Sequence, residues 1–187
     1  MSMFTINSVS PSEFDGFTAY LNEHLAENGT IEVGYFQPLS RSTSTFPADR
    51  AAAFRSGLEI PVGQQGWRRA WISRGGEGQI VGHIDLRGHG ERHTEHRCLL
   101  GMGVHRHWRK QGVGSALIQH AKLWAGSTNR LEHIDLQVLS SNQAALALYR
   151  RSGFVHVGEI SEMFKIDGQY LAYTTMTMPV HGERSAV

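Results

Sequence analysis

A short basic segment with two glycines joins a predicted strand to a predicted helix; it consists of Arg109, Lys110, Gln111, Gly112, Val113, Gly114 and Ser115. A helix start presents unpaired backbone N–H groups and the positive end of the helix dipole, so it can bind a phosphate group. The glycines allow the backbone to approach an anion closely, and the arginine and lysine add positive charge. The segment therefore predicts an anion site, although two glycines at a helix start are also typical of an ordinary turn.

The predicted strand before this segment, residues 97–104, also contains glycines. Gly101 and Gly103 interrupt an apolar run, which weakens a strand unless a ligand or another backbone lies close to it. The main-chain groups of Met102 and Val104 are suited to pair with an extended molecule, as an added strand would. We therefore expect a bound molecule along this strand.

A third candidate element is a short predicted helix over residues 142–151. Asn142 and Tyr149 are two helical turns apart, so they lie on nearly the same face and can meet the same ligand. The alternative for Tyr149 is a purely structural role as a core aromatic beside Ala145 and Leu146.

The elements that position these residues can be predicted from periodicity and from turn and capping signals. A first strand is expected over residues 3–9, and a helix that starts with the capping box of Ser10 and Glu13, with Pro11 in its first turn, runs to about Gly29. Further helices are expected over 47–58, 112–125 and 142–151, and further strands over 67–73, 79–87, 97–104, 133–139 and 154–160. Closing antiparallel strands are expected over 162–178, with a turn at Asp167-Gly168. The irregular stretch 30–46 carries Tyr35 and Phe36, and loops with aromatic residues often cover a site.

Composition limits the possible classes of function. The 187 residues, 40% of them hydrophobic, predict one globular domain, over residues 1–180, with a frayed tail at 181–187. Lys+Arg number 18 and Asp+Glu 17, so a nucleic acid is not expected as the main partner. The single cysteine, Cys98, cannot form an intrachain disulfide, and there is no apolar run of membrane-spanning length. We expect a cytoplasmic protein that does not bind membranes.

Eleven histidines, several of them between His83 and His107, raise the question of a metal site. Their spacing is not accompanied by the cysteines or paired carboxylates that structural and catalytic metal sites use. We expect these histidines to be solvated or hydrogen-bonded, and we expect no bound metal.

Taken together, these features resemble the GNAT superfamily, the Gcn5-related N-acetyltransferases. The resemblance rests on the strand at 99–104, on the pattern Arg109-x-x-Gly112-x-Gly114, and on the pattern Asn142-x-x-Ala145-x-x-Leu148-Tyr149-x-x-Ser152-Gly153-Phe154. It covers residues 80–160, which would be the acetyl-CoA-binding core, while residues 1–75 would form the acceptor side. It implies a mixed α/β (α+β) single domain with a mostly antiparallel central sheet, splayed fourth and fifth strands, and helices on both faces.

The resemblance also implies how acetyl-CoA would bind as co-substrate. Backbone amides of residues 111–115 would bind its pyrophosphate, and the main chain of Met102 and Val104 would pair with the pantetheine arm. An amide near Met102 or Gly103 would polarise the thioester carbonyl. The cofactor-binding residues are then Met102, Gly103, Val104, Arg109, Lys110, Gln111, Gly112, Val113, Gly114, Ser115 and Asn142.

By the same resemblance, Tyr149 is the candidate general acid that protonates the departing thiolate, and Asn142 would bind the pantetheine or help to position Tyr149. A thiol with a pKa of ~8.5 and a tyrosine with a pKa of ~10 make full proton transfer uphill by about 2 kcal/mol. We therefore expect Tyr149 to act mainly as a hydrogen-bond donor.

The sequence does not identify a general base. Some family members use a glutamate on the fourth strand, and the matching position here is Cys98. The candidates by location are Asp85, His96, Glu32 and Glu59, with an ordered water as an equal alternative. For Asp85 the simpler interpretation is a charge pair with Arg87 on the same strand face.

Three functions remain open at this point. The first is an acetyl-CoA-dependent N-acyltransferase that acts on a primary amine. We expect the amine to belong to a small molecule and not to a protein, because the sequence has no acidic run that would bind a basic peptide. The others are a non-catalytic acyl-CoA-binding sensor and a nucleotide-binding protein. Strand edges in the C-terminal half allow a homodimer.

Overall fold

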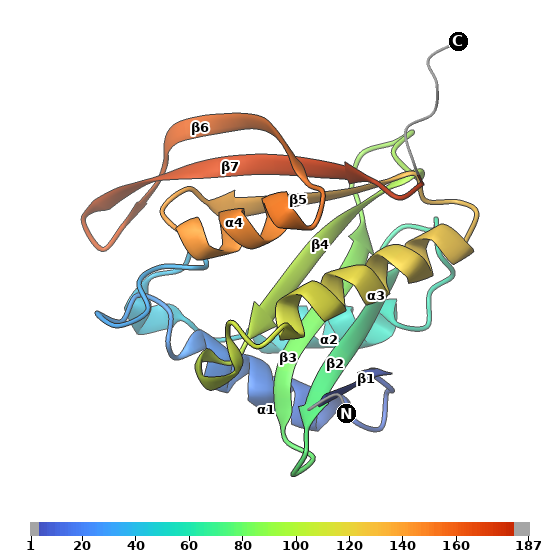
Figure 1. Ribbon diagram of the computed structural model, residues 1–187, viewed down its shortest axis with the longest axis horizontal. Coiled ribbons are helices and arrows are strands. Elements are labelled where there is room, and N and C mark those ends of the chain that lie inside the picture. Colours follow the sequence, from blue (N-terminus) through green and yellow to red (C-terminus); the bar gives the residue numbers. More distant parts are fainter. Residues whose placement is uncertain (1–3, 182–187) are drawn as a thin grey trace.

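The computed structural model describes residues 4–181, which form a sheet with helices on both faces (Figure 1). Within these residues the sheet has seven strands in the order β1-β2-β3-β4-β5-β7-β6. The strands are β1 (Phe4–Ser8), β2 (Arg68–Gly75), β3 (Ile80–Gly88), β4 (Arg97–Val104), β5 (His133–Leu139), β6 (Val155–Ile166) and β7 (Gln169–Pro179). The helices are α1 (Phe14–Leu25), α2 (Ala48–Gly57), α3 (Val113–Ser127) and α4 (Gln143–Arg151), with short 3-10 turns η1 (Arg41–Thr43) and η2 (Arg106–Trp108).

Helices cover both faces because each has an apolar side that must be buried. On one face, Phe17 of α1 and Phe54 of α2 pack with Ile72 of β2. On the other face, Leu117 of α3 packs with Ile84 of β3 in a larger core that also includes α4. Neighbouring strands pair antiparallel except β4 and β5, which are parallel. The predicted mixed α/β fold with a mostly antiparallel sheet is confirmed. None of the helices in the described part of the chain is long and apolar enough to span a membrane.

Strands β4 and β5 separate part-way along their length. They pair only from Arg97 to Leu99, whereas β4 continues to Val104 against β3. A polar network holds the paired end together, because Arg97 donates hydrogen bonds to both carboxylate oxygens of Asp135 on β5 and, at 2.9 Å, to Thr177 on β7. The remainder of β4 has no partner on β5, so the expected splay of the fourth and fifth strands is confirmed.

Helix α1 begins later than its capping signal suggests. Ser10 Oγ does donate to the Glu13 carboxylate at 2.8 Å, as in a capping box. That contact closes a turn before the helix, however, and Glu13 itself is the residue that precedes the first helical position, Phe14. The expectation that Pro11 lies in the first helical turn is therefore wrong.

Strand β6 is longer than expected. The sequence predicts a break near residue 161, but the strand passes through this point as a bulge between Ile160 and Phe164, with Glu162 at a φ of +53°. Most of the predicted frayed tail, residues 182–187, lies outside the described residues.

Strand β6 forms one edge of the sheet, and it carries exposed apolar side chains. Val155, Val157 and Ile160 are 58%, 61% and 58% exposed. Edge strands with apolar side chains are suited to pair with another chain, so a homodimer through β6 stays a prediction.

Candidate active site

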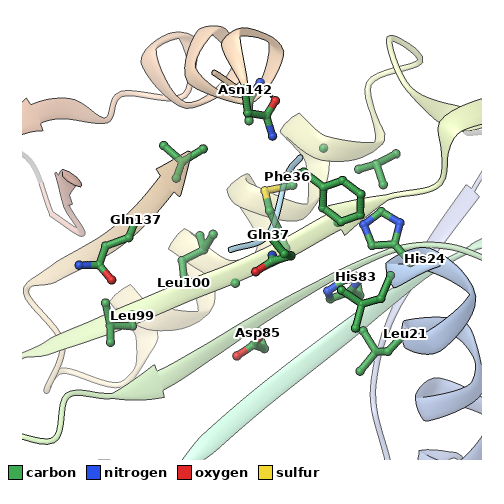
Figure 2. Close-up of a pocket in the computed structure, with 18 of the residues that line it drawn as sticks. Leu21, His24, Phe36, Gln37, His83, Asp85, Leu99, Leu100, Gln137 and Asn142 are labelled. Carbon is green, nitrogen blue, oxygen red and sulfur yellow. Dashed lines mark hydrogen bonds between the residues drawn. The ribbon is translucent and has the colours of Figure 1, made fainter. Parts of the chain in front are cut away.

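A cavity of about 980 Å³ lies where β4 and β5 separate. Its walls come from α1, α2 and the loop between them, from β3, β4 and β5, and from α3 and α4. Figure 2 shows Asn142 reaching from α4 toward this space, with Asp85 and His83 on β3 and Gln137 on β5. The volume is that of a cofactor or small-molecule site.

The start of α3 forms one end of the cavity and has the geometry of an anion site. Gly112 precedes the helix with a φ of +85°, and Lys110 has a φ of +60°. Residues with a left-handed backbone conformation in such a turn direct successive N–H groups into one concavity. The first N–H groups of a helix also have no intrahelical acceptor. A Cβ at Gly112 would meet no atom within 4 Å, so the backbone angle is what requires glycine there. With Arg109 and Lys110 in the same wall, this end fits phosphate groups.

Other residues of this segment have roles that the sequence does not reveal. A Cβ at Gly114 would lie 2.9 Å from Leu148 Cδ2, so Gly114 allows α3 to pack closely against α4. The Val113 side chain is buried in the core, and the Gln111 side chain donates to the carbonyl of His107 at 2.7 Å. Neither residue lines the cavity, so the structure does not bring these two of the expected cofactor residues to it. The other expected cofactor residues, Met102, Gly103, Val104, Arg109, Lys110, Gly112, Gly114, Ser115 and Asn142, all line it.

Helix α4 places two side chains at the cavity. The Asn142 side-chain oxygen accepts a hydrogen bond from the Ala145 N–H at 3.2 Å and so caps the helix, which leaves the amide NH2 as a donor for a ligand. Tyr149 is 8% exposed, and its ring packs edge-on against Phe154. Burial raises the pKa of the Tyr149 hydroxyl, so at neutral pH it stays protonated and can donate a hydrogen bond.

The glycines of β4 make room for polar side chains at the other end of the cavity. A Cβ at Gly101 would lie 2.6 Å from Asp85 Oδ1, and a Cβ at Gly103 would lie 2.5 Å from His24 Nε2 and 2.8 Å from His83 Cε1. The sequence predicts a ligand or another backbone close to these glycines, whereas the structure places a carboxylate and two imidazoles there. Burial lowers the pKa of His24 to about 3 and that of His83 to about 4, so both rings are neutral at pH 7.

The two imidazoles belong to an aromatic wall. The His24 ring stacks on Tyr20 with centroids 6.0 Å apart and lies 4.8 Å from the Phe36 ring. The Tyr20 hydroxyl is 3.4 Å from His83 Nδ1. Phe36 comes from the loop between α1 and α2, so the aromatic stretch at 30–46 does border the cavity (Figure 2).

Of the four candidate general bases, only Asp85 lines the cavity. Asp85 lines the cavity and forms the charge pair with Arg87 that the sequence suggests, at 3.4 Å. His96 lies in the turn before β4, where its ring contacts His133, and it does not line the cavity. Neither do Glu32 and Glu59, which are exposed.

Three further histidines make ordinary contacts. His89 Nε2 lies 3.0 Å from an Asp135 carboxylate oxygen, and the His105 and His107 rings lie 5.3 Å apart. Among residues 4–181, no group of three or more His, Cys, Asp or Glu side chains is arranged to hold a metal ion.

A hydrogen-bonded clasp fixes the loop between α1 and α2. Asp167, in the turn between β6 and β7, accepts hydrogen bonds from Tyr35 Oη, Ser40 Oγ and the Arg41 N–H at 2.5, 2.6 and 2.9 Å. The bonds from Ser40 and then Tyr35 lower the pKa of Asp167 to about 2. Because the loop borders the cavity, this clasp holds one of its walls.

Replacing Asp167 with asparagine should loosen this wall. Asparagine tolerates the positive φ of Asp167, +47°, but offers one acceptor oxygen to three donors. We expect the Arg41 amide to exchange its hydrogen roughly tenfold faster, read by hydrogen-exchange mass spectrometry, with Glu77→Gln as the control. Because the pKa of Asp167 is lower in the folded protein than in the unfolded chain, the stability that the clasp contributes is complete above pH 4. It is lost as the pH falls through about 2. Unchanged exchange at Arg41 would contradict the role of the clasp.

Comparison with known proteins places the chain among acetyltransferases. The family model described as "Acetyltransferase (GNAT) family" matches residues 42–154. The L-amino acid N-acetyltransferase of Escherichia coli (strain K12) is 26% identical over 95 residues, which are 51% of this chain and 59% of that protein. The chain thus spans little more than half the length of this curated relative.

Solved structures share the fold. The acetyltransferase of GNAT family from Streptococcus pneumoniae has a TM-score of 0.78 at 20% identity, with 95% of this chain and 99% of that chain covered. The GNAT superfamily phosphinothricin acetyltransferase from Sinorhizobium meliloti, solved in complex with AcCoA, has a TM-score of 0.76 at 15% identity, with 95% and 88% covered. Since the family model matches more than half of its residues, the chain belongs to the GNAT acetyltransferase family.

Proposed function

We propose that this protein transfers the acetyl group of acetyl-CoA to a primary amine of a small molecule, by direct attack of the amine on the thioester. One observation carries the proposal. A single cavity connects the glycine-containing start of α3, the unpaired part of β4 and Tyr149 with a polar pocket on the side of α1 and α2. A donor and an acceptor bound at the two ends would meet at the gap between the strands.

The donor end would bind acetyl-CoA, which supplies the activated acetyl group. N–H groups at the start of α3, where Gly112, Gly114 and Ser115 line the cavity, would bind its phosphates. The main chain of Met102 and Val104 would pair with the pantetheine arm as an added strand does, and an N–H at Gly103 or its neighbour would donate to the thioester oxygen. The Asn142 amide would donate a further bond to the pantetheine.

Tyr149 would donate a hydrogen bond to the leaving sulfur. Neither His24 nor His83 can act as the general base that removes the amine proton. Their pKa values of about 3 and 4 make them weak bases. Proton transfer from an ammonium of pKa ~10 would be uphill by about 8 kcal/mol to His83 and by about 10 kcal/mol to His24. We therefore propose that the neutral fraction of the amine reacts and that water carries its proton away. Asp85 is engaged by arginines and is not assigned this role.

The acceptor end supports a small substrate. Its walls come from α1, α2 and the clasped loop, within residues 1–75, with His83, Asp85 and Arg87 of β3 as floor. The Escherichia coli relative is named for L-amino acids and the Sinorhizobium meliloti structure for phosphinothricin, which are small molecules. A concave pocket of this kind favours such an acceptor over a protein.

The proposal is tested by measuring release of free thiol from acetyl-CoA with a panel of small primary amines. We expect transfer to at least one amine, with the acetylated product identified by mass spectrometry. Saturable binding of acetyl-CoA without transfer to any amine would indicate a non-catalytic acyl-CoA sensor instead. ATP that displaces CoA in a thermal-shift competition would indicate a nucleotide site.

A further inference from the structure

The cavity carries much more positive than negative charge. Its ionisable lining residues, histidine and tyrosine aside, are Arg50, Arg68, Arg87, Arg109, Lys110, Arg151 and Asp85. The whole chain is nearly balanced, with 18 Lys+Arg and 17 Asp+Glu, so the excess is local. The cations near α3 and α4 match the phosphates of the proposed donor. The three arginines of α2, β2 and β3 are at the acceptor end, and the donor does not account for them.

Arg68 is the buried member of this group. Its guanidinium lies 4.1 Å from the centroid of the Phe54 ring, its side chain is 22% exposed, and burial lowers its pKa. The nearest carboxylate oxygen, Asp85 Oδ2, is 3.7 Å from Nε, which is too long for a hydrogen bond. A guanidinium has five N–H donors in a planar fork that matches an oxyanion. A largely desolvated one with a single long ion pair is well prepared to bind an anion.

Asp85 is shared between two guanidiniums. Arg87 Nη1 lies 3.4 Å from the same oxygen that faces Arg68. One carboxylate between two guanidiniums leaves a net positive charge in the pocket, and it positions both arginines. The other oxygen, Oδ1, lies against Gly101, the residue before Met102. The arginines are therefore close to the stretch of β4 where the thioester is proposed to lie.

We propose that the acceptor is a primary amine that also carries an oxyanion, a carboxylate in the simplest case, and that Arg68 and Arg87 bind this group. Arg50 of α2, which is exposed in the same wall, attracts the anion at the entrance. The inference rests on the proposed acetyltransferase function and specifies the acceptor as a zwitterion such as an amino acid. Polyamines are disfavoured, because the acceptor end would repel a second positive charge.

The first test compares acceptors that differ only in charge. Each L-amino acid is assayed beside its carboxamide, with aminomethylphosphonate and spermidine as further probes. The carboxamide has the less basic amine, so more of it is neutral at a given pH, and this bias works against the inference. We expect kcat/KM to be at least about tenfold higher for the preferred amino acid than for its carboxamide. Equal use of the two, or a preference for spermidine, overturns the inference.

The second test removes the arginines one at a time. Arg68→Gln and Arg87→Gln should lower kcat/KM for the amino acid about tenfold or more through KM, and change that for the carboxamide less than about twofold. The ratio of the two values does not depend on the fraction of folded enzyme, so a loss of stability does not mimic the result. Arg50→Gln, at an exposed position, should give a smaller change of the same sign.

Arg92 provides the matched control. It is exposed, in the loop between β3 and β4, and it does not line the cavity, so Arg92→Gln should leave both acceptors unaffected. An unchanged acid-to-amide ratio in all three cavity variants would refute the arginine site even if amines are acetylated. Failure of all amines to react would instead refute the acetyltransferase function.

Discussion

Replacing Tyr149 with phenylalanine is expected to lower kcat at least tenfold, and up to roughly 1,000-fold, with less than about a twofold change in the Kd for acetyl-CoA. The substitution removes one hydroxyl and keeps the ring that packs against Phe154. The hydroxyl would be needed only as negative charge develops on the leaving sulfur, so its loss should affect the chemical step and not binding. Single-turnover kinetics and equilibrium binding measure the two effects separately.

The pH dependence of the native protein gives an independent check. Because burial raises the pKa of Tyr149, its hydroxyl should stay protonated well past pH 9, and the rate should continue to rise as the amine deprotonates. Tyr170→Phe, which removes a hydroxyl from an exposed tyrosine of β7, should leave kcat unchanged. Full turnover in Tyr149→Phe would remove Tyr149 from the mechanism.

The donor half of the fold is predictable because its signals are local. The expected strands 97–104 and 133–139 coincide with β4 and β5, since each is a short apolar run between turn residues. The start of α1 is not predictable in the same way, because the bond between Ser10 and Glu13 is present both in a capped helix and in a simple turn. The bulge of β6 depends on its pairing with β7, which single-strand periodicity does not show.

The acceptor end could be predicted only in part. The glycines at 101 and 103 indicate that something approaches β4, but they do not show that the groups come from the neighbouring strand β3 and from α1, which is far away in the sequence. His24 follows Phe17 and Leu21 on the apolar face of α1. This position on the helix is the only feature of the nearby sequence that indicates a buried ring. Arg68 gives no such sign, because its contact with Phe54 depends on how α2 packs on β2.

Replacing Gly112 with valine should raise the KM for acetyl-CoA at least about 100-fold. A β-branched residue is strained at a φ of +85°, so the turn would shift and the N–H groups at the start of α3 would lose their common direction. Loss of two charge-assisted hydrogen bonds to phosphate, each worth about 1.5 to 3 kcal/mol, accounts for an effect of this size. Calorimetric titration of acetyl-CoA and of inorganic pyrophosphate would measure the loss directly.

Gly78 is a close control for this substitution, because it separates backbone strain from ligand binding. It lies in the turn between β2 and β3 with a φ of +83°, and a Cβ there, as at Gly112, would meet no atom within 4 Å. Gly78→Val should therefore cost about as much stability, of the order of 1 to 3 kcal/mol, and leave the KM for acetyl-CoA unchanged because the turn does not line the cavity. If both variants lose affinity equally, the effect comes from general destabilisation. If only Gly112→Val loses it, the turn before α3 binds the phosphates of the donor.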